Sequence, residues 1–93
     1  MAITRINEFQ AQPGRGHELK TFLLSFTGTI ESAAGCLSCR LLQGQDDPDR
    51  IVVVEEWDST AAHQAALANV KPEDLQAGMQ LCAGPPRGAW FTG

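Results

Sequence analysis

The segment that most limits the fold is Ile51–Trp57, which reads IVVVEEW. Its β-branched residues favour a strand, but they follow one another without alternating with polar residues. Strands with this pattern are usually buried on both faces of their sheet. A chain of 93 residues can cover one face with its own helices. We therefore expect a second copy of the chain, in a homodimer, to cover the other face.

The composition predicts one small globular domain over residues 1–93. The hydrophobic fraction is 43% and the charged fraction 19%, which is typical of a folded chain and not of a disordered one. The net charge of −4 and the absence of a basic stripe argue against a nucleic-acid partner. The sequence has neither a signal-peptide pattern nor an apolar run near ~20 residues, so we expect a cytoplasmic protein with no membrane partner.

The three cysteines, Cys36, Cys39 and Cys82, are an odd number that does not suit a disulfide framework. Together with two histidines they form no paired clusters, so we expect no metal site. No GxGxxG motif is present, and we expect no cofactor. Cys36 and Cys39 lie on a predicted strand, where positions i and i+3 face opposite sides, so they are not predicted to be a redox pair. Cys82 is predicted to lie on a helix and to be one of its packing residues.

The remaining pattern predicts an α+β chain in the ferredoxin-like order β-α-β-β-α(α)-β, with an antiparallel sheet and helices on one face. Strands are expected over 1–10, 36–43, 51–57 and 88–92, with a hairpin loop at 44–49. Helices are expected over 16–34 and 60–69, and a third should begin at Pro72. Gly35 suits the left-handed position after the first helix. Leu37, Cys39 and Leu41 are expected to share one face.

Several stretches resemble the antibiotic biosynthesis monooxygenase family. They are GCLSCRLL, IVVVEEWDS followed by an alanine-rich helix, and a first strand followed by Pro-Gly and an amphipathic helix. The resemblance covers about Ile3 to Phe91 and implies a dimeric α+β barrel, in which two ferredoxin-like units pack sheet against sheet. The family includes cofactor-independent oxygenases of phenols and hydroquinones, haem-degrading enzymes and members of unknown activity, so membership alone does not fix the function.

The resemblance also implies comparisons at single residues. Family members often carry a histidine at the position of Ala66, whereas His63 lies one turn earlier on the same side of the helix. Asn7 matches the asparagine of haem-degrading relatives by its distance from the turn at Gly14. The helix tryptophan of those relatives is missing here, and this departure argues against haem degradation.

The catalytic candidates are His63, Asn7 and Trp57. His63 shares a helical stripe with Ala66 and Val70, so it should face inward, either to accept a phenolic proton or as a structural histidine. Trp57 could donate its indole N–H to a substrate oxygen or anchor the core. Asn7 interrupts an apolar strand face, and its amide would bind either a substrate oxygen or a backbone group.

The substrate-binding candidates lie on the expected inner face of the first strand and on the first helix: Arg5, Phe9, Phe22 and Phe26. Arg5 could balance an anionic substrate, extend its charged end to solvent, or pair with Glu55 or Glu56. The combined expectation is a cofactor-independent monooxygenase that oxidises a small electron-rich aromatic, such as a hydroquinone, anthrone or polyphenol, with O2. The alternatives are a non-catalytic dimeric module that binds a small hydrophobic metabolite and, less favoured, a haem-degrading enzyme.

Overall fold

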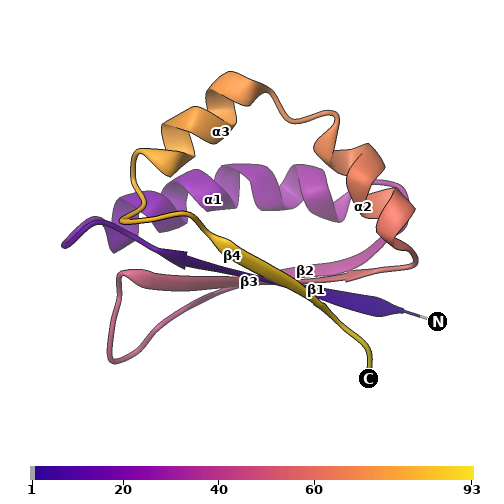
Figure 1. Cartoon of the computed structure of the whole chain (residues 1–93), viewed down its shortest axis with the longest axis horizontal. Helices are drawn as coiled ribbons and strands as arrows, with labels where there is room; N and C mark the ends of the chain where they lie inside the picture. The colour runs from indigo at the N-terminus through magenta and orange to yellow at the C-terminus, as the bar shows by residue number, and fades with distance from the viewer. Residues whose placement is uncertain (1) are drawn as a thin grey trace.

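The computed structural model describes residues 2–93, and these form one antiparallel sheet with helices on one side (Figure 1). The strands are β1 (Ile3–Gln10), β2 (Cys36–Gln43), β3 (Arg50–Trp57) and β4 (Arg87–Phe91), in the spatial order β2-β3-β1-β4. The helices are α1 (Gly16–Glu31), α2 (Thr60–Leu67) and α3 (Pro72–Met79). The predicted α+β ferredoxin-like layout is confirmed, with the third helix inserted before the last strand.

The helix boundaries follow from capping residues. Ser59 Oγ accepts a hydrogen bond from the backbone N–H of Ala62 at 3.1 Å and thereby caps α2. Pro72 occupies the first turn of α3, where its missing N–H is not needed. The first helix ends at Glu31, three residues before the predicted end. Ser32 follows that end and donates its hydroxyl to the carbonyl of Gly28 at 2.8 Å, a local bond that competes with helix continuation.

The turn from α1 to β2 requires a glycine. Gly35 has φ +86°, which side chains disfavour. A Cβ at this position would lie 2.5 Å from Cβ of Ala62 and 2.6 Å from Oδ1 of Asp58. Gly35 therefore lets the turn pack tightly against the start of α2. It lies four residues after the end of α1 and not directly after the helix, as the sequence predicted.

A bulge in β2 overturns one prediction. Cys36 pairs with Trp57 and Cys39 pairs with Glu55, with a register shift directly after Cys36. Because Trp57 and Glu55 are two residues apart on β3, they lie on the same face, and so do the two cysteines. The expectation that Cys36 and Cys39 face opposite sides is therefore wrong. Leu37, at the bulge, is 58% exposed and does not share the face of Cys39.

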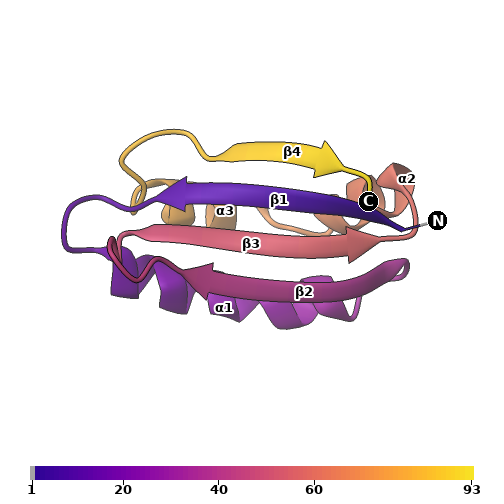
Figure 2. The same ribbon diagram turned by 90° about the horizontal axis from the view of Figure 1, so that it is seen from below.

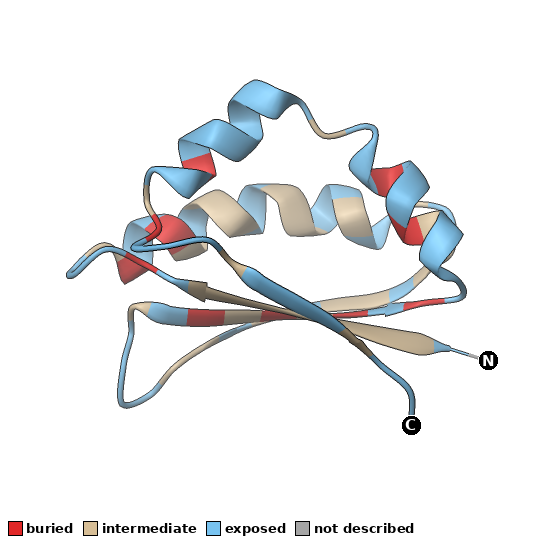
Figure 3. Ribbon diagram, viewed as in Figure 1, coloured by how far each residue is buried: buried red, intermediate tan, exposed pale blue. Residues whose placement is uncertain are grey.

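The most deeply buried cluster lies between α1 and one end of the sheet (Figure 3). It consists of Ala11, Leu19, Ile51 and Cys82. Cys82 lies beyond the end of α3 and forms an isolated bridge with Ala11. The prediction of a helical Cys82 is therefore wrong, although its side chain does pack in the core.

The other face of the sheet carries no helix, as the view from below shows (Figure 2). Val52 and Val54 point to this face and are half-buried, whereas Ile51 and Val53 on the helix side are buried. One chain therefore covers only one face of β3, and burial of both faces would need a partner. No helix within residues 2–93 has the length and apolar character needed to cross a membrane.

Candidate active site

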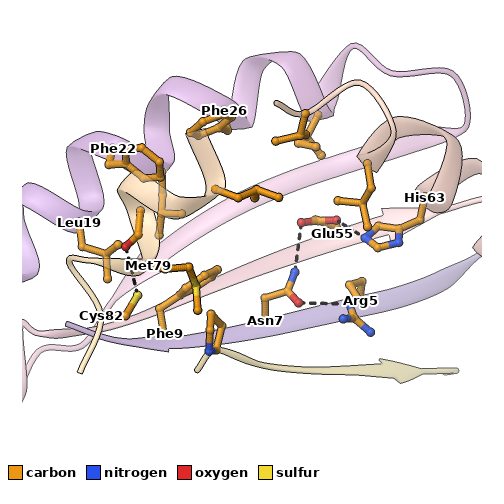
Figure 4. Close-up of a pocket in the computed structure, with 17 residues that line it drawn as sticks. Arg5, Asn7, Phe9, Leu19, Phe22, Phe26, Glu55, His63, Met79 and Cys82 are labelled. Carbon is orange, nitrogen blue, oxygen red and sulfur yellow. Dashed lines mark hydrogen bonds and ion pairs between the residues drawn. The ribbon is translucent and has the colours of Figure 1, made fainter. Parts of the chain in front are cut away.

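A cavity of about 270 Å³ lies between the helices and the covered face of the sheet (Figure 4). Its walls are mostly apolar. Phe22 and Phe26 line one wall, with ring centroids 4.9 Å apart, and Phe9 lines the sheet side. The cavity is larger than the ~150 Å³ needed to hold benzene and just below the range of about 300–1,000 Å³ typical of sites for drug-sized ligands. The fold thus brings the three predicted phenylalanines together around a space for a small aromatic molecule.

One end of the cavity is polar, and Glu55 lies at its centre. Glu55 is only 6% exposed. Asn7, from the neighbouring strand, donates its Nδ2 to Oε2 of Glu55 at 3.4 Å, and Arg5 donates Nε to Oδ1 of Asn7 at 3.1 Å. His63 on α2 places Nε2 at 3.9 Å from Oε1 of Glu55. Four polar side chains from β1, β3 and α2 therefore meet beside the apolar cavity (Figure 4).

Trp57 supports this cluster from behind. Its side chain is fully buried, and its indole N–H donates to Oε1 of Glu55 at 2.9 Å. Of the two alternatives for Trp57, its burial agrees with a core anchor, and its N–H is donated to a carboxylate. Trp57 is not among the residues that line the cavity, so within this structure its contact with the site runs through Glu55 and His63.

His63 faces inward as its helical stripe predicts, and it is 8% exposed. Its ring packs edge-on against Trp57 and Trp90, with centroid distances of 5.3 and 5.0 Å. Burial lowers the pKa of His63 below its ordinary value, the nearby carboxylate of Glu55 opposes this, and the charge of Arg5 adds to it. The imidazole is therefore neutral at pH 7 and able to accept a proton.

Arg5 does not form the carboxylate pair that the sequence suggested. It lies directly opposite Glu55 in the β1–β3 register, yet it makes no ion pair with any carboxylate in residues 2–93. Its side chain instead hydrogen-bonds Asn7 and lies over the ring of Trp90, with Cζ 5.2 Å from the centroid. This cation–π contact and the single hydrogen bond fix the guanidinium at the polar end of the cavity.

The two cysteines on the inner face of β2 are poor nucleophiles. Burial, with smaller contributions from Glu55 and Cys36, raises the pKa of Cys39 to about 12. Burial also raises the pKa of Cys36. A thiol must ionise to react, so both side chains remain protonated at neutral pH. Across residues 2–93 no group of three or more His, Cys, Asp or Glu side chains is placed to hold a metal ion.

Sequence reasoning missed two members of the site. For Glu55 the sequence suggested only a pair with an arginine, shared as an alternative with Glu56, although its position two residues before Trp57 on a strand already placed both side chains on one face. Trp90 carried no usable signal. Its strand β4 is short, and only the pairing of β4 with β1, which is distant in sequence, places Trp90 opposite Arg5.

Comparison with known proteins agrees with this architecture. No curated protein matched the sequence. A Chloroflexus aurantiacus J-10-fl protein described as a candidate antibiotic biosynthesis monooxygenase is 28% identical, with a TM-score of 0.76 over 100% of this chain and 95% of that one.

Two more distant structures share the fold. A mutant of SnoaB, a cofactor-independent oxygenase from Streptomyces nogalater, is 21% identical, with a TM-score of 0.82 over 99% of this chain and 93% of that one. The protein PA3566 from Pseudomonas aeruginosa is also 21% identical, with a TM-score of 0.84 over the same shares of the two chains. The model of one family, antibiotic biosynthesis monooxygenase, matches residues 2–78. The chain therefore belongs to the antibiotic biosynthesis monooxygenase family.

Proposed function

We propose that the protein is a cofactor-independent monooxygenase that oxidises a small electron-rich aromatic, such as a hydroquinone, anthrone or polyphenol, with O2. The observation that carries this proposal is the junction of an apolar cavity with a buried, neutral histidine. The apolar walls suit an aromatic ring and would reduce the contact of water with the reactive species formed on it. The histidine is the group that can start the reaction by removing a phenolic proton.

The proposed first step is proton transfer from the phenolic O–H of the substrate to the imidazole of His63. Asn7 lines the same end of the cavity, and we assign its amide to orienting the substrate oxygen. Trp57 is assigned a positioning role, because its indole N–H holds Glu55 beside His63. Phe9, Phe22 and Phe26 would pack against the ring of the substrate.

The electrons would then come from the substrate itself. The phenolate gives one electron to O2, which leaves superoxide and a phenoxyl radical. Their combination forms a carbon–oxygen bond at the ring position opposite the phenolic oxygen. An anthrone reacts through its enol tautomer, whose hydroxyl lies opposite the carbon that is CH2 in the keto form. Over the whole reaction this carbon loses both hydrogens, one oxygen atom of O2 stays on it as a ketone, and the other leaves as water. The substrate supplies all four electrons, so no further reductant is needed.

Oxygen consumption by the purified protein over a panel of hydroquinones, anthrones and polyphenols tests this function. Replacing His63 with alanine should lower the rate about 10²- to 10⁴-fold, the usual contribution of a general base. His17 is an exposed histidine on α1, and His17→Ala is the matched control, which should leave the rate unchanged. Equal rates in His63→Ala and the parent protein would rule out the assigned base. Binding of aromatics without oxygen uptake would favour the alternative of a non-catalytic binding module.

We further propose that two copies pair through the uncovered sheet face. This face combines apolar and charged side chains, and two of its large hydrophobic residues, Leu42 and Phe91, are 44% and 49% exposed. Pairing would also complete the burial of Val52 and Val54 on β3. Light scattering should give a mass twice the 10.0 kDa of one chain. A mass of a single chain at micromolar concentration would contradict the dimer.

A further inference from the structure

We infer that the cavity selects an aromatic molecule bearing an anionic oxygen group, with a carboxylate as the best match, and that Arg5 binds this group. The identity of the ring rests on the proposed function. The charge preference rests on the surroundings of Arg5 alone, so it can be tested by binding without any turnover.

The first observation is that the guanidinium of Arg5 is fixed but only partly used. Its Nε donates to Asn7, and its Cζ lies over the ring of Trp90. Neither terminal nitrogen takes part in a hydrogen bond or ion pair within residues 2–93. A guanidinium in this state presents a fork of N–H donors whose geometry matches the two oxygens of a carboxylate.

The second observation concerns the balance of charge. Glu55 is the only carboxylate that lines the cavity among the described residues, and both of its oxygens already accept hydrogen bonds, one from Trp57 and one from Asn7. Asn7 thus stands between Glu55 and Arg5 and separates the two charges. A carboxylate on the ligand would be the first direct anionic partner of Arg5, beside walls that are otherwise apolar.

The third observation is that β4 leaves space for this arginine. Gly88 lies opposite Asn7 in the β1–β4 pairing. A Cβ at position 88 would lie 2.6 Å from Oδ1 of Asn7 and 2.7 Å from Cζ of Arg5, which is too close for either atom to keep its place. Glycine at this position therefore allows the guanidinium to lie across β4 at the edge of the cavity.

Calorimetric titration with 2-naphthoate and its neutral isostere 2-naphthamide tests the preference. The two molecules have nearly the same shape, so a difference in Kd reports the charge. We expect naphthoate to bind more tightly to the parent protein. In Arg5→Gln its Kd should rise roughly 10- to 100-fold, the effect of losing charge-assisted hydrogen bonds, while the Kd of naphthamide changes little.

Two further variants define the role of the arginine. Arg5→Lys keeps the charge but loses the fork, so it should recover only part of the preference. Arg15→Gln removes the same charge on the outside of the protein, where Arg15 pairs with Glu18, and should have no effect. Equal binding of naphthoate and naphthamide to the parent protein, or a preference that persists in Arg5→Gln, would overturn the inference.

A phenolate is the other possible source of the anionic oxygen, and 4-nitrophenol tests it above and below its own pKa. Burial lowers the pKa of His63, so its imidazole titrates at a more acidic pH than a free histidine would. An Arg5-dependent gain in affinity on ionisation would assign the site to both kinds of anion, and no gain would restrict it to carboxylates. If no substrate causes oxygen uptake but naphthoate still binds more tightly than naphthamide, the oxygenase function is rejected and the anion-binding site at Arg5 is retained.

Discussion

Replacing Glu55 tests whether one buried carboxylate organises the polar end of the cavity. In Glu55→Ala the indole N–H of Trp57, which is fully buried, loses its acceptor at 2.9 Å. An orphaned buried donor costs about 1–3 kcal/mol. The longer bond from Asn7, at 3.4 Å, and the space left by the side chain add to this cost. We expect a total loss of about 2–4 kcal/mol in the free energy of unfolding.

Thermal unfolding measures this loss. For a domain of this size, 1 kcal/mol corresponds to about 4–8 °C, so Tm should fall by roughly 8–30 °C in Glu55→Ala. Glu55→Gln retains an acceptor for Trp57, so its Tm should fall by less. The variants must be compared at one protein concentration, since dimer formation would make Tm depend on it. A change in Tm of less than about 2 °C in Glu55→Ala would refute the assignment of Glu55 as an organising group.

The same variant has an electrostatic consequence at His63. The charge of Glu55 opposes the effect of burial on the pKa of His63. Glu55→Gln removes that charge, so the pKa of His63 should fall further below its ordinary value. An NMR titration of the imidazole would measure the change, with Glu56→Gln on the opposite face of β3 as the control. An increase in the pKa of His63 would show that the two side chains do not interact as the structure places them.

Further predictions concern pH, reactivity and packing. Folding lowers the pKa of His63. Its contribution to the free energy of unfolding is therefore complete above the unfolded pKa of about 6.5 and should decline as the pH falls through the folded pKa. Denaturant titrations over this pH range should show a fall in unfolding free energy that is smaller in His63→Gln. The pKa of Cys39, about 12, predicts slow alkylation by iodoacetamide at pH 8, and labelling as fast as for free cysteine would contradict it. A Cβ at Gly78 would lie 2.8 Å from Cζ of Phe22, so Gly78→Ala should push α3 or the Phe22 ring aside. The Kd of ligands bound in the cavity should then change severalfold. An unaltered Kd would show that this contact does not shape the cavity. Ser59→Ala should lower the free energy of unfolding by about 0.5–2 kcal/mol in a denaturant titration, since it removes the cap of α2.

Local signals were sufficient for much of the fold. The apolar run of β3, the stripe of α1 and the Pro72 start of α3 each correspond to an element in the structure. These signals depend on residues close in sequence, whose periodicity and capping chemistry act within one or two turns. The bulge at Leu37 was not predicted, because pairing with β3 decides it. The early end of α1 accompanies a local bond from Ser32 to Gly28, which the apolar stripe of the helix does not reveal.

The sequence by itself determined which residues could take part in chemistry: the inward side of His63, the shared face of Arg5 and Asn7, and the aromatic side chains of α1. Only the tertiary structure decided how they connect. It placed Asn7 between Arg5 and Glu55, gave the indole N–H of Trp57 to a carboxylate, and put Cys36 on the same face as Cys39. The physical reason is that periodicity fixes the direction of a side chain along one element, whereas hydrogen-bond partners depend on strand register and helix docking. Those are set by contacts across the whole chain.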